Sequence, residues 1–126
     1  MAEIKSRQER PAQGVEYSEI HISDEENLGT GVFAIALEPK AMLNVPIVSS
    51  IVNVPVFQMF VNINYSDDEV TVVLGRADNN PPLSREVFVL PKNLDVTRVY
   101  KFDVLFKDWK LEELKMNGAA LEKASG

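Results

Sequence analysis

The chain has 126 residues, of which 45% are hydrophobic and 25% charged, a composition typical of one globular domain and not of a disordered or membrane-spanning chain. Its net charge of −6 argues against a nucleic-acid partner, because phosphate binding relies on clustered lysines and arginines. With no cysteine, the chain has neither a disulfide framework nor a thiolate nucleophile.

The two ends of the chain are expected to lie outside the fold. Residues 1–14 are polar and mixed in charge, with Pro11 and no apolar periodicity, which predicts a flexible N-terminal arm; residues 122–126 predict a C-terminal tail. The first residues do not resemble a signal peptide either. We therefore expect a single soluble domain at residues 15–121, cytoplasmic if the chain is complete and extracellular if it is a fragment of a secreted parent.

The first predicted strands lie at residues 16–22 and 31–38. Residues 16–22 alternate imperfectly and predict a strand that could lie at a sheet edge, with His21 on the surface. Residues 31–38 carry Phe33, Ile35 and Leu37 on one side and small apolar residues on the other, which predicts a strand covered on both faces.

A hairpin is predicted at residues 57–76. Residues 42–54, just before it, are rich in valine and isoleucine but are punctuated by Pro46 and Pro55, so we expect an edge strand or an extended excursion. Residues 57–65 alternate and place Gln58, Asn62 and Asn64 on the outward side. A Ser-Asp-Asp turn then leads into residues 69–76. The inward set of the first strand is Phe57, Met59, Val61, Ile63 and Tyr65.

The last strands are predicted at residues 85–90 and 99–118. The first of these places Val87 and Val89 on one face and Glu86 and Phe88 on the other. In the second region, aromatic and aliphatic residues alternate with polar ones from residue 100 to residue 107, and a break with Trp109 follows. The alternating apolar residues are Tyr100, Phe102, Val104 and Phe106.

The apolar phase changes within residues 109–116. Trp109 and Leu111 share one parity and Leu114 and Met116 share the other, so this segment is either a strand with a bulge near Glu112-Glu113 or a short helix. The sheet context and the following Asn117-Gly118, a dipeptide that often forms hairpin turns, favour the bulged strand.

About eight short strands separated by turn signals predict an all-β fold. No amphipathic helix of useful length separates any two of them, which argues against a parallel sheet with crossover helices. The expected architecture is therefore an antiparallel β-sandwich, a jelly roll, of about eight or more short strands.

Residues 100–118, ending in Asn117-Gly118, resemble the closing hairpin of concanavalin A-like jelly rolls, the superfamily of laminin G-like domains and galectins. The resemblance implies a lectin-like binding module. Galectins bind galactosides with a His-x-Asn-Pro-Arg strand and a Trp-Gly-x-Glu motif, whereas the corresponding strand here has the sequence Thr71-Val-Val-Leu-Gly-Arg76. Only Arg76 could be an equivalent, so the galectin sugar site is not carried over.

The sequence offers no catalytic residues. His21 is the only histidine, which excludes a cluster of histidines as a metal site, and its position predicts an ordinary surface side chain. The acidic runs at residues 24–26, 67–69 and 112–113 lie at turns or solvent faces and do not alternate along one strand as paired catalytic carboxylates would. We therefore expect a protein that is not an enzyme.

Candidate binding residues lie on the central hairpin and at its rim. Gln58, Asn62, Asn64 and Arg76 are expected on its outward faces, where they would contact a carbohydrate or a protein partner. Trp109 either stacks on a sugar or belongs to the core.

Calcium is the one ion that the rim loops suit, because it takes carboxylate and carbonyl oxygens. Asp67, Asp68 and Asp78 are the candidate ligands. The alternative for these three residues is plain turn chemistry, in which aspartate bonds to its own backbone.

The alternative function is structural. The proline-punctuated residues 42–56 would pack against another chain, so that the domain is a subunit of a larger complex or a homo-oligomer.

Overall fold

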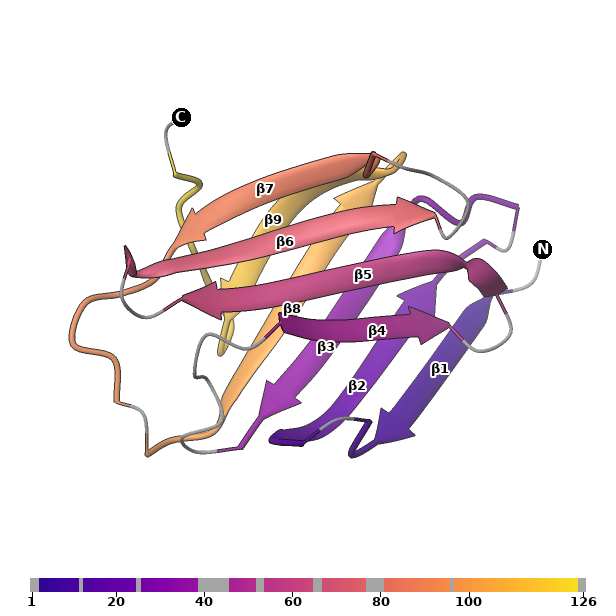
Figure 1. Ribbon diagram of the computed structural model, residues 1–126. Coiled ribbons are helices and arrows are strands. Elements are labelled where there is room, and N and C mark those ends of the chain that lie inside the picture. The colour runs from indigo at the N-terminus through magenta and orange to yellow at the C-terminus, as the bar shows by residue number, and fades with distance from the viewer. Residues whose placement is uncertain are drawn as a thin grey trace.

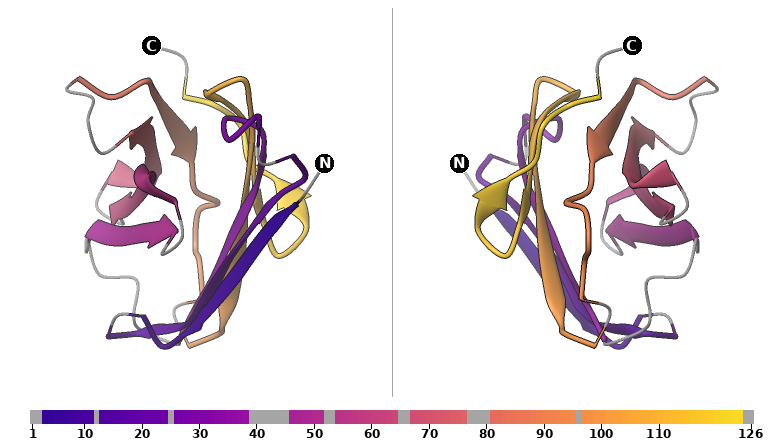
Figure 2. Two further views of the ribbon diagram at one scale, coloured as in Figure 1. Left: turned by 90° about the vertical axis from the view of Figure 1, so that its right-hand side faces the viewer. Right: turned by 90° about the vertical axis from the view of Figure 1, so that its left-hand side faces the viewer.

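The computed structural model describes residues 3–11, 13–24, 26–38, 46–51, 54–64, 67–76, 81–95 and 97–124. Within these residues the chain forms ten strands in two antiparallel sheets, which face each other as a β-sandwich (Figures 1 and 2). The prediction of an all-β antiparallel sandwich with eight or more short strands is confirmed. The described residues include no helix that is long and apolar enough to span a membrane.

The larger sheet has six strands in the order β1-β2-β3-β8-β9-β10, and the smaller sheet has four in the order β4-β5-β6-β7. In the described part of the chain, β3 and β8 are the only neighbours that are not consecutive, so the chain leaves the larger sheet after β3 and returns beside it at β8. The strands of the larger sheet are β1 (Ile4–Glu9), β2 (Val15–Ile22), β3 (Gly31–Leu37), β8 (Tyr100–Lys107), β9 (Lys110–Met116) and β10 (Ala119–Ala120). Those of the smaller sheet are β4 (Pro46–Ile51), β5 (Val54–Asn64), β6 (Glu69–Arg76) and β7 (Ser84–Val89).

The core lies between the sheets and is made by the alternate residues that the sequence pattern singles out. Along β8 the inward residues are buried and the outward ones partly exposed, as expected for a strand with one face in the core. The same alternation on β5 and β6 confirms the central hairpin, whose strands pair from Phe57–Arg76 to Asn64–Glu69. The core residues of these three strands are Tyr100, Phe102, Val104, Phe106, Met59, Val61, Ile63, Val70, Val72 and Leu74.

The prediction of a flexible arm at residues 1–14 was wrong for β1. This strand pairs with β2 along its whole length, from Ile4 opposite Ile22 to Glu9 opposite Tyr17. Its sequence has a single apolar residue, so the sequence shows no hydrophobic period that would predict a strand. Backbone pairing and polar side-chain contacts attach β1 to β2. Because β1 occupies the margin of the sheet, β2 is an inner strand and not an edge strand.

The prediction of a free tail at residues 122–126 was wrong for residues 122–124. The Val89 N–H donates to the Glu122 carbonyl over 2.8 Å, and the Ala124 N–H donates to the Val87 carbonyl over 2.8 Å. The segment therefore covers the outer edge of β7. Nearby, the Leu111 N–H of β9 donates to Ser84 Oγ of β7 over 3.1 Å, which links the two sheets along this margin.

The sequence pattern left open which face of β7 is buried. Phe88 and Leu90 face the core, whereas Val89 is 42% exposed. The sequence alternates apolar residues on both faces here, and the bulkier phenylalanine and leucine take the buried side because they remove more apolar surface from water.

The bulge in β9 is confirmed. Leu105 pairs with Glu113 and Phe106 pairs with Leu111, so Glu112 has no partner on β8. The extra residue turns both Leu111 and Leu114 toward the core.

The Asn117-Gly118 turn joins β9 to β10. Both residues have positive φ, 49° and 87°, as a two-residue hairpin turn of this kind requires. Asn117 also extends the ladder with β8: its N–H donates to the Lys101 carbonyl and its Oδ1 accepts from the Lys101 N–H, each over 2.8 Å.

Residues 46–51 form an edge strand, which was one of the two predicted alternatives. Pro46 opens β4, and Pro55 lies where the pairing of β5 with β4 is interrupted, so neither proline removes a donor that the ladder needs. The other residues of the predicted segment, 42–45 and 52–53, lie outside the described residues.

Candidate functional site

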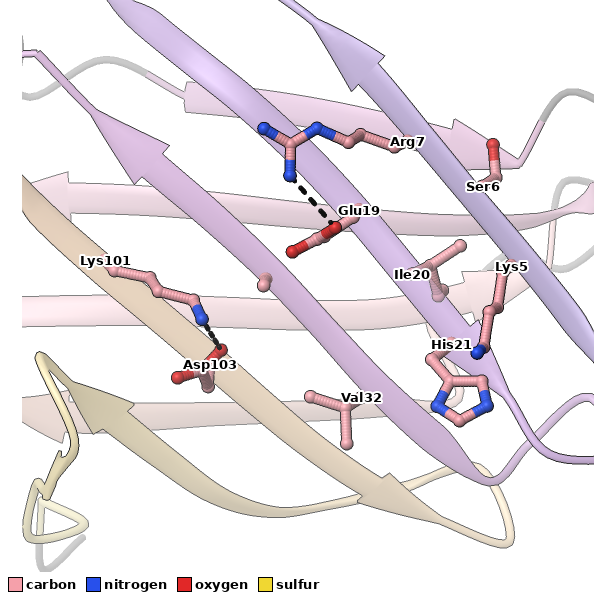
Figure 3. A pocket seen from close by; sticks show the side chains of 10 residues that line it. Lys5, Ser6, Arg7, Glu19, Ile20, His21, Val32, Lys101 and Asp103 are labelled. Atoms are coloured by element: carbon pink, nitrogen blue, oxygen red, sulfur yellow. Dashed lines mark hydrogen bonds and ion pairs between the residues drawn. The ribbon is translucent and has the colours of Figure 1, made fainter.

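The outer face of the larger sheet carries a hollow of about 580 Å³, which we call the outer-face hollow (Figure 3). Its floor is formed by Val32 and Ala34 of β3. Residues of β1 and β2 line one side, and Lys101 and Asp103 of β8 line the other. The residues from β1 and β2 are Lys5, Ser6, Arg7, Glu19, Ile20 and His21.

The hollow follows from the sequence of β3. Ala34 points outward between Glu19 on β2 and Asp103 on β8, which are its cross-strand partners. A methyl group flanked by longer polar side chains leaves space above it, and those side chains cover the alanine itself, which is only 6% exposed. A small residue in a central strand therefore creates a depression whose walls come from its neighbours.

Ion pairs hold the walls in place. Arg7 Nη1 lies 3.2 Å from Glu19 Oε2, Arg7 Nε lies 2.6 Å from Glu9 Oε1, and the guanidinium stands 4.0 Å from the centre of the Tyr17 ring. On the opposite wall, Lys101 Nζ lies 3.7 Å from Asp103 Oδ1. These groups are partly exposed, so each pair adds little stability, but together they fix the direction of the side chains.

Glu3 joins the end of β1 to β2. Its carboxylate lies 2.9 Å from His21 Nε2 and 3.4 Å from Lys5 Nζ. The hydrogen bond with His21, followed by the charge of Lys5, lowers the pKa of Glu3 below its ordinary value of 4.5. Since the ionised carboxylate is the form that these contacts favour, they act above the ordinary pKa and are lost as the pH falls through the lowered one.

His21→Ala is therefore expected to raise the pKa of Glu3 toward 4.5. The measurement is an NMR titration of the Glu3 side-chain carboxyl carbon in the two proteins. Asp95, in the loop before β8, serves as the reference carboxyl, because the hydrogen bonds from Thr97 that lower its pKa should not change. A Glu3 titration that is the same in both proteins would contradict the contact.

The outer-face hollow is open, and charged side chains stand around its floor. Small-molecule sites usually enclose most of the ligand, which an open hollow does not do. None of the described residues that line it is a tryptophan, tyrosine or phenylalanine, so it lacks the large ring on which sugars usually stack. The paired charges can instead exchange partners with charged side chains of another protein.

No family model, curated protein or solved structure matches the chain. The resemblance to concanavalin A-like jelly rolls therefore stays a prediction. The evidence for a function is therefore the geometry of the protein's own surface.

The predicted binding residues of the central hairpin lie on the other sheet, away from the outer-face hollow. Asn62 and Asn64 are half-buried on the outer face of β5, and Asn64 Nδ2 donates to Asp67 Oδ2 over 2.6 Å. Gln58 shares their parity and pairs with Gly75. Phe60, which is 37% exposed, lies next to Asn62 on this face.

Arg76 pairs with Phe57 at the end of the ladder between β5 and β6. Its role in binding stays a prediction.

Trp109 lies in the two-residue turn between β8 and β9. Asp108 and Trp109 both have positive φ, 51° and 66°. The Trp109 N–H donates to the Gly29 carbonyl over 2.9 Å, and its half-buried ring packs against the core. Of the two alternatives for this residue, its position agrees with the core role, and it does not line the outer-face hollow.

The candidate calcium ligands lie at the turn between β5 and β6. Asp67 and Asp68 are exposed there, and the Asp68 carbonyl accepts a hydrogen bond of 2.7 Å from the Leu90 N–H. Asp78 lies outside the described residues. Among the described residues, no group of three or more histidine, aspartate or glutamate side chains is placed to hold a metal ion. Calcium binding stays a prediction.

The outer-face hollow was missed because three of its ten residues belong to β1, which was not predicted as a strand, and the others are spread over the end of β2, β3 and β8. The one indication in the sequence was that the outward residues Ala34 and Ala36 of β3 are small, whereas a strand covered on both faces would carry larger ones. These alanines indicate a hollow only once β1 and β8 are known to lie in the same sheet.

Proposed function

We propose that the protein is a non-catalytic binding module that recognises a protein partner through the outer-face hollow. The observation that carries the proposal is the 580 Å³ depression over Ala34 of β3, with paired charges on β1 and β2 along one side and on β8 along the other. Four strands give such a surface a rigid base, which limits the entropy lost when a partner binds.

A protein partner fits this surface better than a carbohydrate. Arg7, Glu19, Lys101 and Asp103 present both signs of charge, and charged pairs across an interface give specificity and orientation. A neutral sugar would instead need an aromatic platform, and Trp109 packs elsewhere. The resemblance to concanavalin A-like jelly rolls supports a binding role by analogy alone, and carbohydrate is the alternative ligand that it implies.

Val32→Lys tests the proposal. Val32 lines the hollow and is 37% exposed, so a lysine there changes the surface without entering the core. Peptides selected from a random phage-displayed library on the wild-type protein should bind Val32→Lys at least about tenfold more weakly, a change of about 1.4 kcal/mol. Affinities are measured by fluorescence polarisation.

Val89→Lys is the matched control, because Val89 is 42% exposed on the other sheet. The selected peptides should bind it as they bind the wild type. Peptides that bind both variants equally well would place recognition outside the hollow. A glycan array, read with and without calcium, that gives hits insensitive to Val32→Lys would support the carbohydrate alternative.

The second candidate is an assembly domain that uses residues 42–56 as its interface. The observation in its favour is the position of β4, which pairs with β5 and lies at the margin of the smaller sheet. An unpaired strand edge is a template for another chain.

A further inference from the structure

The outer edge of β1 has no partner strand among the described residues, and Figure 1 shows β1 at the margin of the larger sheet. The other sheet ends are less open to strand addition. The segment at residues 122–124 covers β7, β10 is two residues long, and β4 begins with a proline. Within the described chain, β1 is the only sheet end of six residues that has neither a proline nor a covering segment.

The free backbone groups of β1 belong to alternate residues. The Arg10 N–H donates to the Glu16 carbonyl over 3.0 Å, which continues the register of β1 with β2. In an antiparallel ladder, pairs that exchange hydrogen bonds alternate with pairs that do not. Ser6 and Gln8 therefore bond to β2, and Lys5, Arg7 and Glu9 direct their N–H and carbonyl groups away from the sheet.

We propose that a second copy of this chain pairs antiparallel with β1 about a two-fold axis at Arg7, joining two six-stranded sheets edge to edge. Strand addition at an open edge uses main-chain hydrogen bonds for affinity and side chains for register. The pairing of identical strands about a two-fold axis closes the assembly as a dimer and leaves no further edge of β1 open.

Charge and strand length together select this register. The residues whose backbone groups are free have odd numbers, so each of them must lie opposite an odd-numbered residue of the partner. With the axis at Ser6, Lys5 would lie opposite the partner's Arg7, and like charges directly opposite each other are destabilising. With the axis at Arg7, Lys5 lies opposite the partner's Glu9, and the two-fold axis forms this pair twice. Axes at Lys5 or Gln8 would pair only three residues of β1.

The two Arg7 side chains that meet at the axis are already turned inward over their own sheets. Each guanidinium is held 3.2 Å from Glu19, on β2, and 4.0 Å from the centre of the Tyr17 ring, also on β2. Glu9 Oε1 accepts from Arg7 Nε, which leaves Oε2 for the partner's Lys5.

The dimer would also extend the outer-face hollow. Lys5, Ser6 and Arg7 line the hollow, and they are the residues beside the axis. The partner's β1 would therefore form an additional wall for each hollow, and the two hollows would lie on one continuous sheet face. This consequence deepens the proposed function, but the pairing itself does not rest on it.

The experiment is sedimentation equilibrium of the wild type and of charge-exchange variants. The wild type should show a monomer–dimer equilibrium. Lys5→Glu and Glu9→Lys should each raise its dissociation constant at least tenfold, because each places like charges across the pair. The double variant K5E/E9K restores opposite charges and should recover the wild-type constant. Thermal unfolding verifies that every variant is folded.

Two proline variants separate edge pairing from general damage to β1. Lys5→Pro removes an N–H that faces the free edge, so it should leave the fold intact and abolish the dimer. Ser6→Pro removes an N–H that bonds to β2 and should instead lower the melting temperature. A wild type that is monomeric at every concentration would overturn the proposal. So would a dimer that is insensitive to both the charge exchange and Lys5→Pro, which would assign association to the segment around β4.

These outcomes are independent of the peptide-binding test. If the protein is a dimer and Val32→Lys does not weaken peptide binding, the β1 pairing is supported and the proposed function is rejected. If the protein is a monomer and Val32→Lys does weaken peptide binding, the proposed function is supported and the β1 pairing is rejected.

Discussion

Phe102→Ala is expected to lower the free energy of unfolding by about 3–5 kcal/mol, the usual cost of truncating a buried phenylalanine. Phe102 is fully buried, at 0% exposure, in the middle of β8. It is paired with Ile35 on β3 and Met116 on β9, so the ring occupies the centre of the larger sheet's inner face. Both neighbouring strands are held by their own ladders and can collapse into the vacated space only partly.

Phe60→Ala is the control for this prediction. It deletes the same atoms from a side chain that is 37% exposed on the outer face of β5, so it should cost less than about 1.5 kcal/mol. The measurement is urea unfolding of both variants and the wild type. Equal losses in the two variants would mean that Phe102 does not fill the space between the sheets.

Gly29→Ala is expected to lower the free energy of unfolding by about 1–3 kcal/mol, as overpacking does in a close-packed region. A Cβ at Gly29 would lie 2.5 Å from Trp109 Cδ1 and 2.7 Å from the Trp109 backbone nitrogen. The same backbone nitrogen donates its hydrogen to the Gly29 carbonyl, so the turn cannot move away without losing this bond. The loop after β2 and the turn after β8 thus fit together only when residue 29 has no side chain.

Gly75→Ala provides the comparison, because a Cβ there would meet its nearest neighbour, Pro82 Cα, at an ordinary 3.8 Å. It should be neutral or stabilise the protein by less than about 1 kcal/mol, through a smaller loss of backbone entropy on folding. Thermal and urea unfolding are read together. A Gly29→Ala protein as stable as Gly75→Ala would show that the loop and the turn are not locked together.

The strands with a regular apolar period were predictable from the sequence. Their alternation also gave the correct buried face of β5, β6 and β8, and the change of phase in residues 109–116 located the bulge at Glu112. These features depend on neighbouring residues, and a period of two is a local signal. At Val87 and Phe88 the pattern is apolar on both faces, so the sequence alone could not choose between them.

The candidate site was not predictable, because its walls come from distant parts of the chain. Ala34 gains Glu19 on one side and Asp103 on the other only through the registers of β2, β3 and β8. The remaining wall belongs to β1, whose polar sequence gives no sign that it is a strand. The sequence shows which side chains are charged or small, but only the pairing of the strands brings them together around a hollow.

The two margins of the sandwich are secured unequally. Residues 122–124 and the Leu111–Ser84 hydrogen bond link the sheets along β7 and β9, whereas β1 and β4 are each attached to the described chain by one ladder. Local unfolding takes the route that breaks the fewest contacts. Partial opening therefore begins at β1 and β4 while the β7–β9 margin stays native. The strand with the unpaired edge is also one of the first to detach, so any partner that pairs with β1 slows its release.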